Sequence, residues 1–190
     1  MIENHAELLA GLADLDPPVY LFGGVAEDVL LHGHLSRPHG DVDVFVLRQD
    51  LPGRMKQFAD LGFDNFELRY APRPGQPLAL GCPRGQTDLE LGVFDTAGSD
   101  VYFEVEDESG VIQRVFLPPD ALVNDEPTNV DGVPVWTLSP LSLVHIRRGL
   151  ELLGTFGSLR EKDIAIQAKL LERFFGGSLP SEPRIEQSRS

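Results

Sequence analysis

The stretch that decides the fold runs from Val19 to Leu47 and reads VYLFGGVAEDVLLHGHLSRPHGDVDVFVL. Its first four residues, 19–22, form a short apolar run that suits a buried strand. Gly23-Gly24 interrupts this run, and the apolar residues that follow have helical spacing over 25–32. Apolar residues then alternate over 41–47, which predicts a second strand.

Asp41 and Asp43 are the acids of that second strand. Residues two apart in a strand point to the same face, so the two carboxylates are expected side by side. Such a pair can share a hard divalent cation, and Mg²⁺ is usually held by one or two carboxylates together with substrate phosphates. The spacing therefore indicates phosphoryl or nucleotidyl transfer.

A third acid is expected from a neighbouring strand. Residues 87–94 alternate polar and apolar side chains, as a strand does, and offer Asp88 and Glu90. Both acids share a face by strand parity, so either one can complete the pair as a metal ligand or as a general base. Asp88 is the first candidate and Glu90 the second. The alternative is that both are solvent-facing acids of an edge strand.

Gly23-Gly24 stands where a strand turns into a helix. Glycine lets the backbone approach a phosphate closely, and a helix N-terminus offers free amides with a partial positive charge. The pattern matches neither the dinucleotide-binding fingerprint nor the P-loop. Followed by Asp-x-Asp on a strand, it predicts a phosphate-binding site.

The rest of the chain predicts a mixed sheet flanked by helices, an α+β (α/β) fold. We expect a nucleotidyltransferase core over 1–135, a C-terminal helical region over 136–177 and a disordered tail over 178–190. Within the core, residues 71–86 and 118–135 are expected to be loops, because proline and glycine are frequent in the first of them. Helix-start signals within the helical region are Ser139-Pro140 and the capping box Ser158 to Glu161.

Composition narrows the classes of protein to which this chain can belong. The 190 residues are 42% apolar, enough for a core, and the single cysteine, Cys82, excludes an internal disulfide. A secretory leader and a membrane span are not expected, which favours a cytoplasmic protein. The net charge of −14 opposes nucleic-acid binding. Residues 88–131 hold twelve acids and one base, whereas residues 145–173 hold six bases and four acids.

Five segments together resemble the DNA polymerase β-type nucleotidyltransferase superfamily, and most of all its aminoglycoside 2''- and lincosamide nucleotidyltransferase group. They are the turn Gly23-Gly24, the sequence SRPHGDVD at 36–43, TDLELGVFD at 87–95, WTLSP at 136–140 and REKD at 160–163. The first two are specific, and the others support them. The sequence departs from the group at Val25, where tryptophan or serine is common, and at Arg147, where lysine is expected.

The resemblance implies an enzyme that moves a nucleoside monophosphate from an NTP, such as ATP, to a hydroxyl group with the help of two Mg²⁺ ions. It implies Asp41, Asp43 and Asp88 as metal ligands, with Asp88 or Glu90 as the catalytic base. The resemblance also implies residues that bind the nucleotide, and the place of further residues in the motifs suggests others. Together these are Gly23, Gly24, Arg37, His39, Arg147 and Lys162.

The acidic stretch favours a small cationic acceptor, as an antibiotic-resistance enzyme would use. Two alternatives stay open. Related toxins modify RNA and have an antitoxin partner, and the basic stretch 145–173 could hold RNA. A catalytically inactive relative would bind nucleotide without transferring it.

Overall fold

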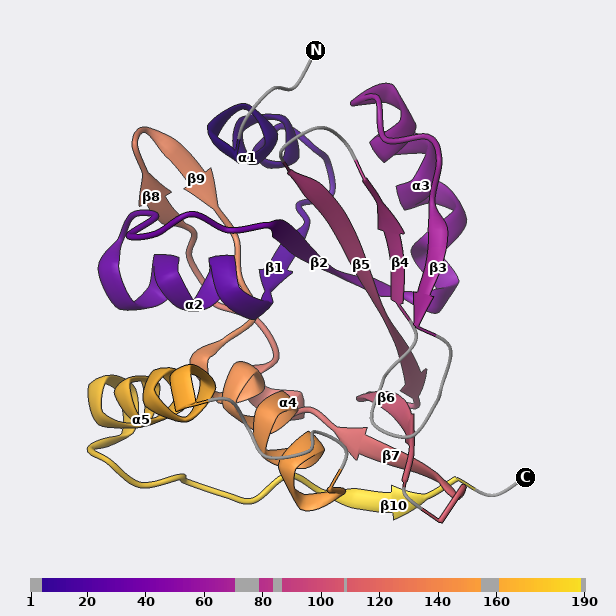
Figure 1. Cartoon of the computed structure of the whole chain (residues 1–190), viewed down its shortest axis with the longest axis vertical. Coiled ribbons are helices and arrows are strands. Elements are labelled where there is room, and N and C mark those ends of the chain that lie inside the picture. Colours follow the sequence, from indigo (N-terminus) through magenta and orange to yellow (C-terminus); the bar gives the residue numbers. More distant parts are fainter. Residues whose placement is uncertain (1–4, 71–78, 84–86, 108, 155–160, 189–190) are drawn as a thin grey trace.

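The computed structural model describes residues 5–70, 79–83, 87–107, 109–154 and 161–188 (Figure 1). The helices are α1 (His5–Ala13), α2 (Gly23–His32), α3 (Leu51–Asp60), α4 (Pro140–Leu152) and α5 (Glu161–Phe175), with 3₁₀ turns η1 (Arg48–Asp50) and η2 (Pro119–Ala121). The strands are β1 (Tyr20–Phe22), β2 (Asp41–Leu47), β3 (Glu67–Tyr70), β4 (Ala79–Cys82), β5 (Asp88–Ala97), β6 (Asp100–Glu106), β7 (Ile112–Phe116), β8 (Thr128–Val130), β9 (Val133–Val135) and β10 (Ile185–Gln187).

The main sheet is mixed, and its longest strand, β5, pairs with β2, β4 and β6. Its path is β1-β2-β5-β6-β7-β10, and β4 joins β5 on one side while β3 pairs with β4. Strands β2 and β5 are parallel, and the other pairs of this sheet are antiparallel. The first half of β5 pairs with β2 and β4, whereas its last residues pair with β6. The expected mixed sheet flanked by helices is confirmed.

The core is formed by buried side chains of this sheet and of all five helices within the described residues. Val42 and Val44 of β2, and Leu89 and Leu91 of β5, are fully buried, as their alternation predicts. Each such side chain contributes roughly 1.5–3 kcal/mol through burial. Helix α2 contacts β1 and β2 on one side and α4 and α5 on the other, so it links the sheet to the C-terminal helices.

Several local predictions are confirmed and others are wrong. Ser139 caps α4, because its hydroxyl accepts a hydrogen bond from the Ser142 amide. Helix α2 begins at Gly23 itself, so the double glycine is its first turn rather than a break before it. The expected loops contain strands: β4 lies within 71–86, and β8 and β9 lie within 118–135. The capping box at 158–161 begins outside the described residues.

The predicted disordered tail is the clearest error. Residues 185–187 form β10 and pair with β7, whose outer edge would otherwise be open. The His145 ring, through Nε2, lies 2.8 Å from the Ser181 carbonyl oxygen, and the Arg184 guanidinium lies 3.7 Å from the centre of the Phe116 ring. The polar composition of the tail did not predict these contacts, because they depend on residues of α4 and β7 that are far away in the sequence.

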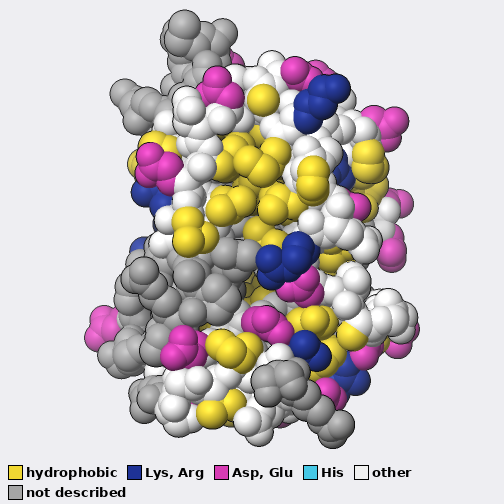
Figure 2. Space-filling view, turned by 90° about the vertical axis from the view of Figure 1, so that its right-hand side faces the viewer, with side chains coloured by type: hydrophobic (Ala, Val, Ile, Leu, Met, Phe, Trp, Pro, Cys, Tyr) yellow, Lys and Arg dark blue, Asp and Glu magenta, His cyan; other side chains and the backbone are white. Residues whose placement is uncertain are grey.

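Figure 2 looks onto the side of the molecule where α3 and β3 lie in Figure 1, and hydrophobic side chains gather in its upper half. Leu68 of β3 has a relative exposure of 58%.

Among the described residues, no helix combines the length and the apolar character needed to cross a bilayer.

Close packing of α4 on β7 gives a first prediction. A Cβ atom added at Gly149 would overlap Cγ1 of Val115, whereas one added at Gly53 of α3 meets no atom within 4 Å. We expect Gly149→Ala to lower the free energy of unfolding by roughly 1–3 kcal/mol through overpacking. Gly53→Ala, the matched control, should raise it by about 0.5–1 kcal/mol through helix propensity. Urea denaturation measures both, and a Gly149→Ala protein as stable as the parent would contradict the packing.

Candidate active site

Four carboxylates lie on one face where β2 and β5 begin. In the parallel register, Asp41 stands opposite Asp88, and Asp43 stands opposite Glu90. The intervening residues of both strands are buried on the other face of the sheet. The four acids therefore line one end of the strand pair, which is the juxtaposition that strand parity predicts.

Asp43 points at the first turn of α2. Gly23 has a φ of +66°, and a Cβ atom at this position would overlap the carboxylate of Asp43. The backbone amide of Gly24 donates a hydrogen bond to the same carboxylate. Glycine is therefore required at position 23 for two reasons, the backbone conformation and the close approach of Asp43. The helix N-terminus that we predicted for phosphate holds this carboxylate.

Burial, together with repulsion from neighbouring carboxylates, raises the pKa values of Asp43 and Glu90. Burial raises the pKa of Asp43 well above its ordinary value, and the charges of Asp41, Glu90 and Glu27 raise it further, against the Gly24 hydrogen bond. Burial also raises the pKa of Glu90, helped by Asp41 and opposed by Arg69. The site thus holds more negative charge than nearby cations neutralise.

The donor set of this face fits a hard cation. Carboxylate oxygens are the ligands that Mg²⁺ prefers, and uncompensated repulsion between them is relieved when a cation binds. Within the described ranges, no three histidine, cysteine, aspartate or glutamate side chains already stand at metal-binding spacing. Two carboxylates from the chain suffice where substrate phosphates supply the other ligands.

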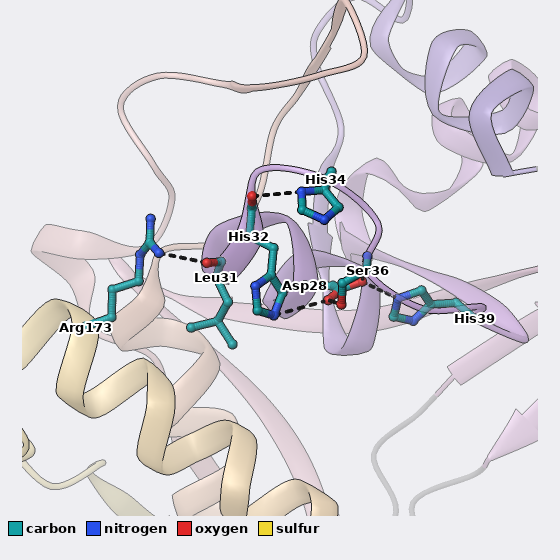
Figure 3. Close-up of polar contacts among 7 residues, drawn as sticks. All are labelled: Asp28, Leu31, His32, His34, Ser36, His39 and Arg173. Carbon is teal, nitrogen blue, oxygen red and sulfur yellow. Dashed lines mark hydrogen bonds and ion pairs between the residues drawn. The ribbon is translucent and has the colours of Figure 1, made fainter.

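Asp28 organises the loop that leads into β2 (Figure 3). Its carboxylate accepts hydrogen bonds from the amide and the hydroxyl of Ser36, and it lies 3.1 Å from Nε2 of His39 and 3.7 Å from Nε2 of His32. Burial raises the pKa of Asp28, but the hydrogen bonds from Ser36 and His39 outweigh it and hold the pKa below its ordinary value. Sequence reasoning missed this residue. The available signal was a charged side chain between apolar positions of α2.

His39 is held inside this network. Its side chain is 3% exposed, and because a carboxylate can only accept, Nε2 carries the proton that faces Asp28. Its other nitrogen, Nδ1, lies near Gly24, as does the guanidinium of Arg37. Three predicted nucleotide-binding residues therefore meet at the first turn of α2.

His5 of α1 is a second residue that sequence reasoning missed. Its ring centre lies 6.3 Å from that of His39, and its Nδ1 lies 3.3 Å from the Thr87 hydroxyl. Its Nε2 is buried and has no hydrogen-bond partner among the described residues. Burial lowers the pKa of His5, and His39 lowers it further while Asp41 opposes both.

A pocket of about 280 Å³ lies between α2, α5 and the segment around Arg37. Its cationic side chains are Arg37, Lys162 and Lys169. Two acids also line it, but Glu27 is paired with an arginine and Asp28 belongs to the network described above. The three cations therefore line a pocket that could hold an anionic ligand.

Arg147 is also predicted to bind nucleotide, but its environment differs from that of the pocket cations. Its guanidinium forms two hydrogen bonds to Glu27 of α2, at 2.5 and 2.7 Å, and lies 3.3 Å from Asp163 of α5. It does not line the pocket between α2 and α5. The structure thus places Arg147 in a buried ion-pair network that joins three helices.

The raised pKa of Asp43 predicts a stability change. The folded protein binds this proton more tightly than the unfolded chain, so stability is lost as pH rises above the ordinary value of 3.8. Asp43→Asn removes that cost and keeps an acceptor for the Gly24 amide. We expect its free energy of unfolding without divalent cations to exceed that of the parent by about 0.5–2 kcal/mol at neutral pH. Urea titrations should show the difference shrinking toward about pH 4, and a less stable variant would contradict it.

Asp28→Asn should change the free energy of unfolding in the opposite direction and lower it. The lowered pKa of Asp28 stabilises the folded protein above the ordinary value of 3.8, and this contribution is lost as pH falls through the lowered pKa. We expect the substitution to cost roughly 1–3 kcal/mol at neutral pH, because a charged acceptor of several hydrogen bonds is lost. The same urea titrations measure it. Equal stability of Asp28→Asn and the parent would refute the role of this carboxylate.

No protein-family model matches the chain, and no curated protein matches it in sequence. Solved structures do match. The solution structure of the antibiotic-resistance factor ANT(2'')-Ia has a TM-score of 0.60 at 15% identity and covers 89% of this chain and 81% of its own. The crystal structure of ANT(2'')-Ia in complex with adenylyl-2''-tobramycin gives the same score and identity, with 89% and 86% covered. The chain therefore has the fold of ANT(2'')-Ia.

Proposed function

We propose that the protein is a nucleotidyltransferase that moves a nucleoside monophosphate from an NTP to a hydroxyl group of a small cationic acceptor. The observation that carries this proposal is the placement of Asp41, Asp43, Asp88 and Glu90 on one face, next to the first turn of α2. A fold alone does not determine a reaction, whereas these four carboxylates indicate one.

Asp41 and Asp43, with Asp88 or Glu90, would hold Mg²⁺. When bound, the ion neutralises phosphate charge and makes a coordinated hydroxyl more acidic. The pKa values of Asp43 and Glu90 are consistent with the assignment: burial raises both, and the charges of neighbouring carboxylates raise them further.

The phosphates of the NTP would lie between the first turn of α2 and the pocket on α5. Arg37 connects the two places, because it approaches Gly24 and also lines the pocket. Lys162 and Lys169 would offset phosphate charge from the other wall. Arg147 would act indirectly, by holding α4 and α5 against α2.

The acceptor side would be formed by β5. The acceptor oxygen forms a bond to the α-phosphorus, the bond to the β-phosphate breaks, and pyrophosphate leaves. A carboxylate of β5 takes the proton of the hydroxyl. Glu90 is suited to this by its raised pKa, and Asp88 by its place opposite Asp41.

The charge of the protein supports a cationic acceptor. A net charge of −14 with the acids concentrated over 88–131 attracts cations and repels nucleic acid. ANT(2'')-Ia, which shares the fold, is an antibiotic-resistance factor seen with adenylyl-2''-tobramycin. An aminoglycoside is therefore the first acceptor to test.

The test is transfer of labelled monophosphate from each of the four NTPs to a panel of aminoglycosides and lincosamides with Mg²⁺. We expect transfer by the parent protein and a loss of at least about 100-fold in kcat for Asp41→Asn and Asp43→Asn, since each removes charge stabilisation at the reacting phosphate. Asp60→Asn, an exposed acid on α3, is the matched control and should keep full activity.

Two results would separate the parts of this proposal. A parent protein that binds Mg-NTP in calorimetry but modifies no member of the panel would exclude this acceptor class and keep the nucleotide site. Equal activity of Asp43→Asn and the parent would exclude the proposed carboxylate chemistry altogether.

A further inference from the structure

The side chain of Arg69 reaches the acid face from a strand that does not itself carry these acids. Arg69 lies on β3, which is separated from β5 by β4. Its Nη2 lies 3.2 Å from Oδ2 of Asp88. Its charge also opposes the rise in the pKa of Glu90. The guanidinium therefore stands beside the two acids that would face the acceptor.

Gly81 makes this reach possible. It lies on β4 directly opposite Glu90, so a side chain there would stand on the same face as the acids. A Cβ atom added at Gly81 would overlap Nε, Cγ and Cδ of Arg69. The arginine side chain thus lies flat across β4 in a channel that only glycine leaves open.

The contact between Arg69 and Asp88 is a weak one. It consists of one hydrogen bond rather than a paired fork, and the two side chains are 36% and 39% exposed. Ion pairs with this exposure contribute about 0–1 kcal/mol. The guanidinium can therefore leave Asp88 at little cost when another cation arrives.

We propose that Arg69 is a specificity-determining residue that competes with the cationic group of the acceptor for Asp88 and Glu90. This inference rests on the proposed function, since it concerns the acceptor side of the same site. In the free protein the guanidinium occupies the place that an ammonium group of the acceptor takes in the complex. Weakly charged acceptors cannot displace it, whereas polycationic acceptors can.

Removal of the competitor should strengthen binding of a polycation. We expect Arg69→Gln to lower the Kd for tobramycin about three- to tenfold, as loss of a pair worth up to about 1 kcal/mol and of one repulsive charge would give. The gain should fall as salt rises. Arg69→Lys keeps the charge and should stay close to the parent. Gly81→Ala keeps the arginine but displaces its side chain, so it should move Kd in the same direction as Arg69→Gln.

The matched control is Arg48→Gln. Arg48 forms two hydrogen bonds to Asp95 at the other end of the same strand pair, so its loss changes the net charge equally but not the acid face. Isothermal titration calorimetry with tobramycin, in the absence of nucleotide and Mg²⁺, compares these variants with the parent. A KM for tobramycin that falls in Arg69→Gln without a change in KM for the NTP would give the same result in turnover.

The outcomes decide both questions separately. Tighter binding by Arg69→Gln than by Arg48→Gln supports the inference, whether or not any protein transfers a nucleotide. Equal or weaker binding by Arg69→Gln overturns it, and so does the absence of measurable tobramycin binding by every variant. Failure of the proposed function shows instead as the absence of transfer and of Mg-NTP binding by the parent.

Discussion

Repulsion between carboxylates on two parallel strands is the constraint around which this protein is arranged. The register of β2 and β5 brings Asp41 opposite Asp88 and Asp43 opposite Glu90. No choice of rotamer removes four acids from one face of a strand pair, because strand parity places them there. The free protein is thus less stable than it would be with neutral residues at these positions, and a bound cation would remove much of the cost.

Other parts of the fold limit that cost. The first turn of α2 accepts Asp43 through the Gly24 amide, and Arg69 offsets charge at Asp88 and Glu90. The contact of Arg69 is partly exposed and weak, so it leaves Asp88 and Glu90 able to bind a ligand. Buried pairs elsewhere are more complete: Arg147 joins Glu27 to Asp163, and Asp28 joins Ser36 to His39. Polar side chains around the acid face are therefore paired, whereas the acids of the face itself are only partly neutralised.

Much of this site could be predicted from local patterns. Asp-x-Asp on a strand, a double glycine before a helix and a second acidic strand each depend on residues close together in the chain. His5 and Arg69 could not be found in this way, and the charge of Asp28 within the mostly apolar α2 did not reveal its partners. Their roles come from contacts across 8 to 82 positions of sequence, as between Asp28 and Ser36 or between His5 and Thr87. The error at β10 has the same origin, because an edge strand pairs through its backbone and needs little apolar character.

The sequence by itself determined the elements around the site and the side of each strand on which its acids lie. Periodicity and glycine placement are local properties, and they govern strand parity and helix starts directly. Only the tertiary structure decided which acids face one another, that Arg147 is sequestered, and that Arg69 reaches Asp88 across Gly81. These outcomes follow from strand register and from side-chain reach across neighbouring strands, and register is set by packing of the whole sheet.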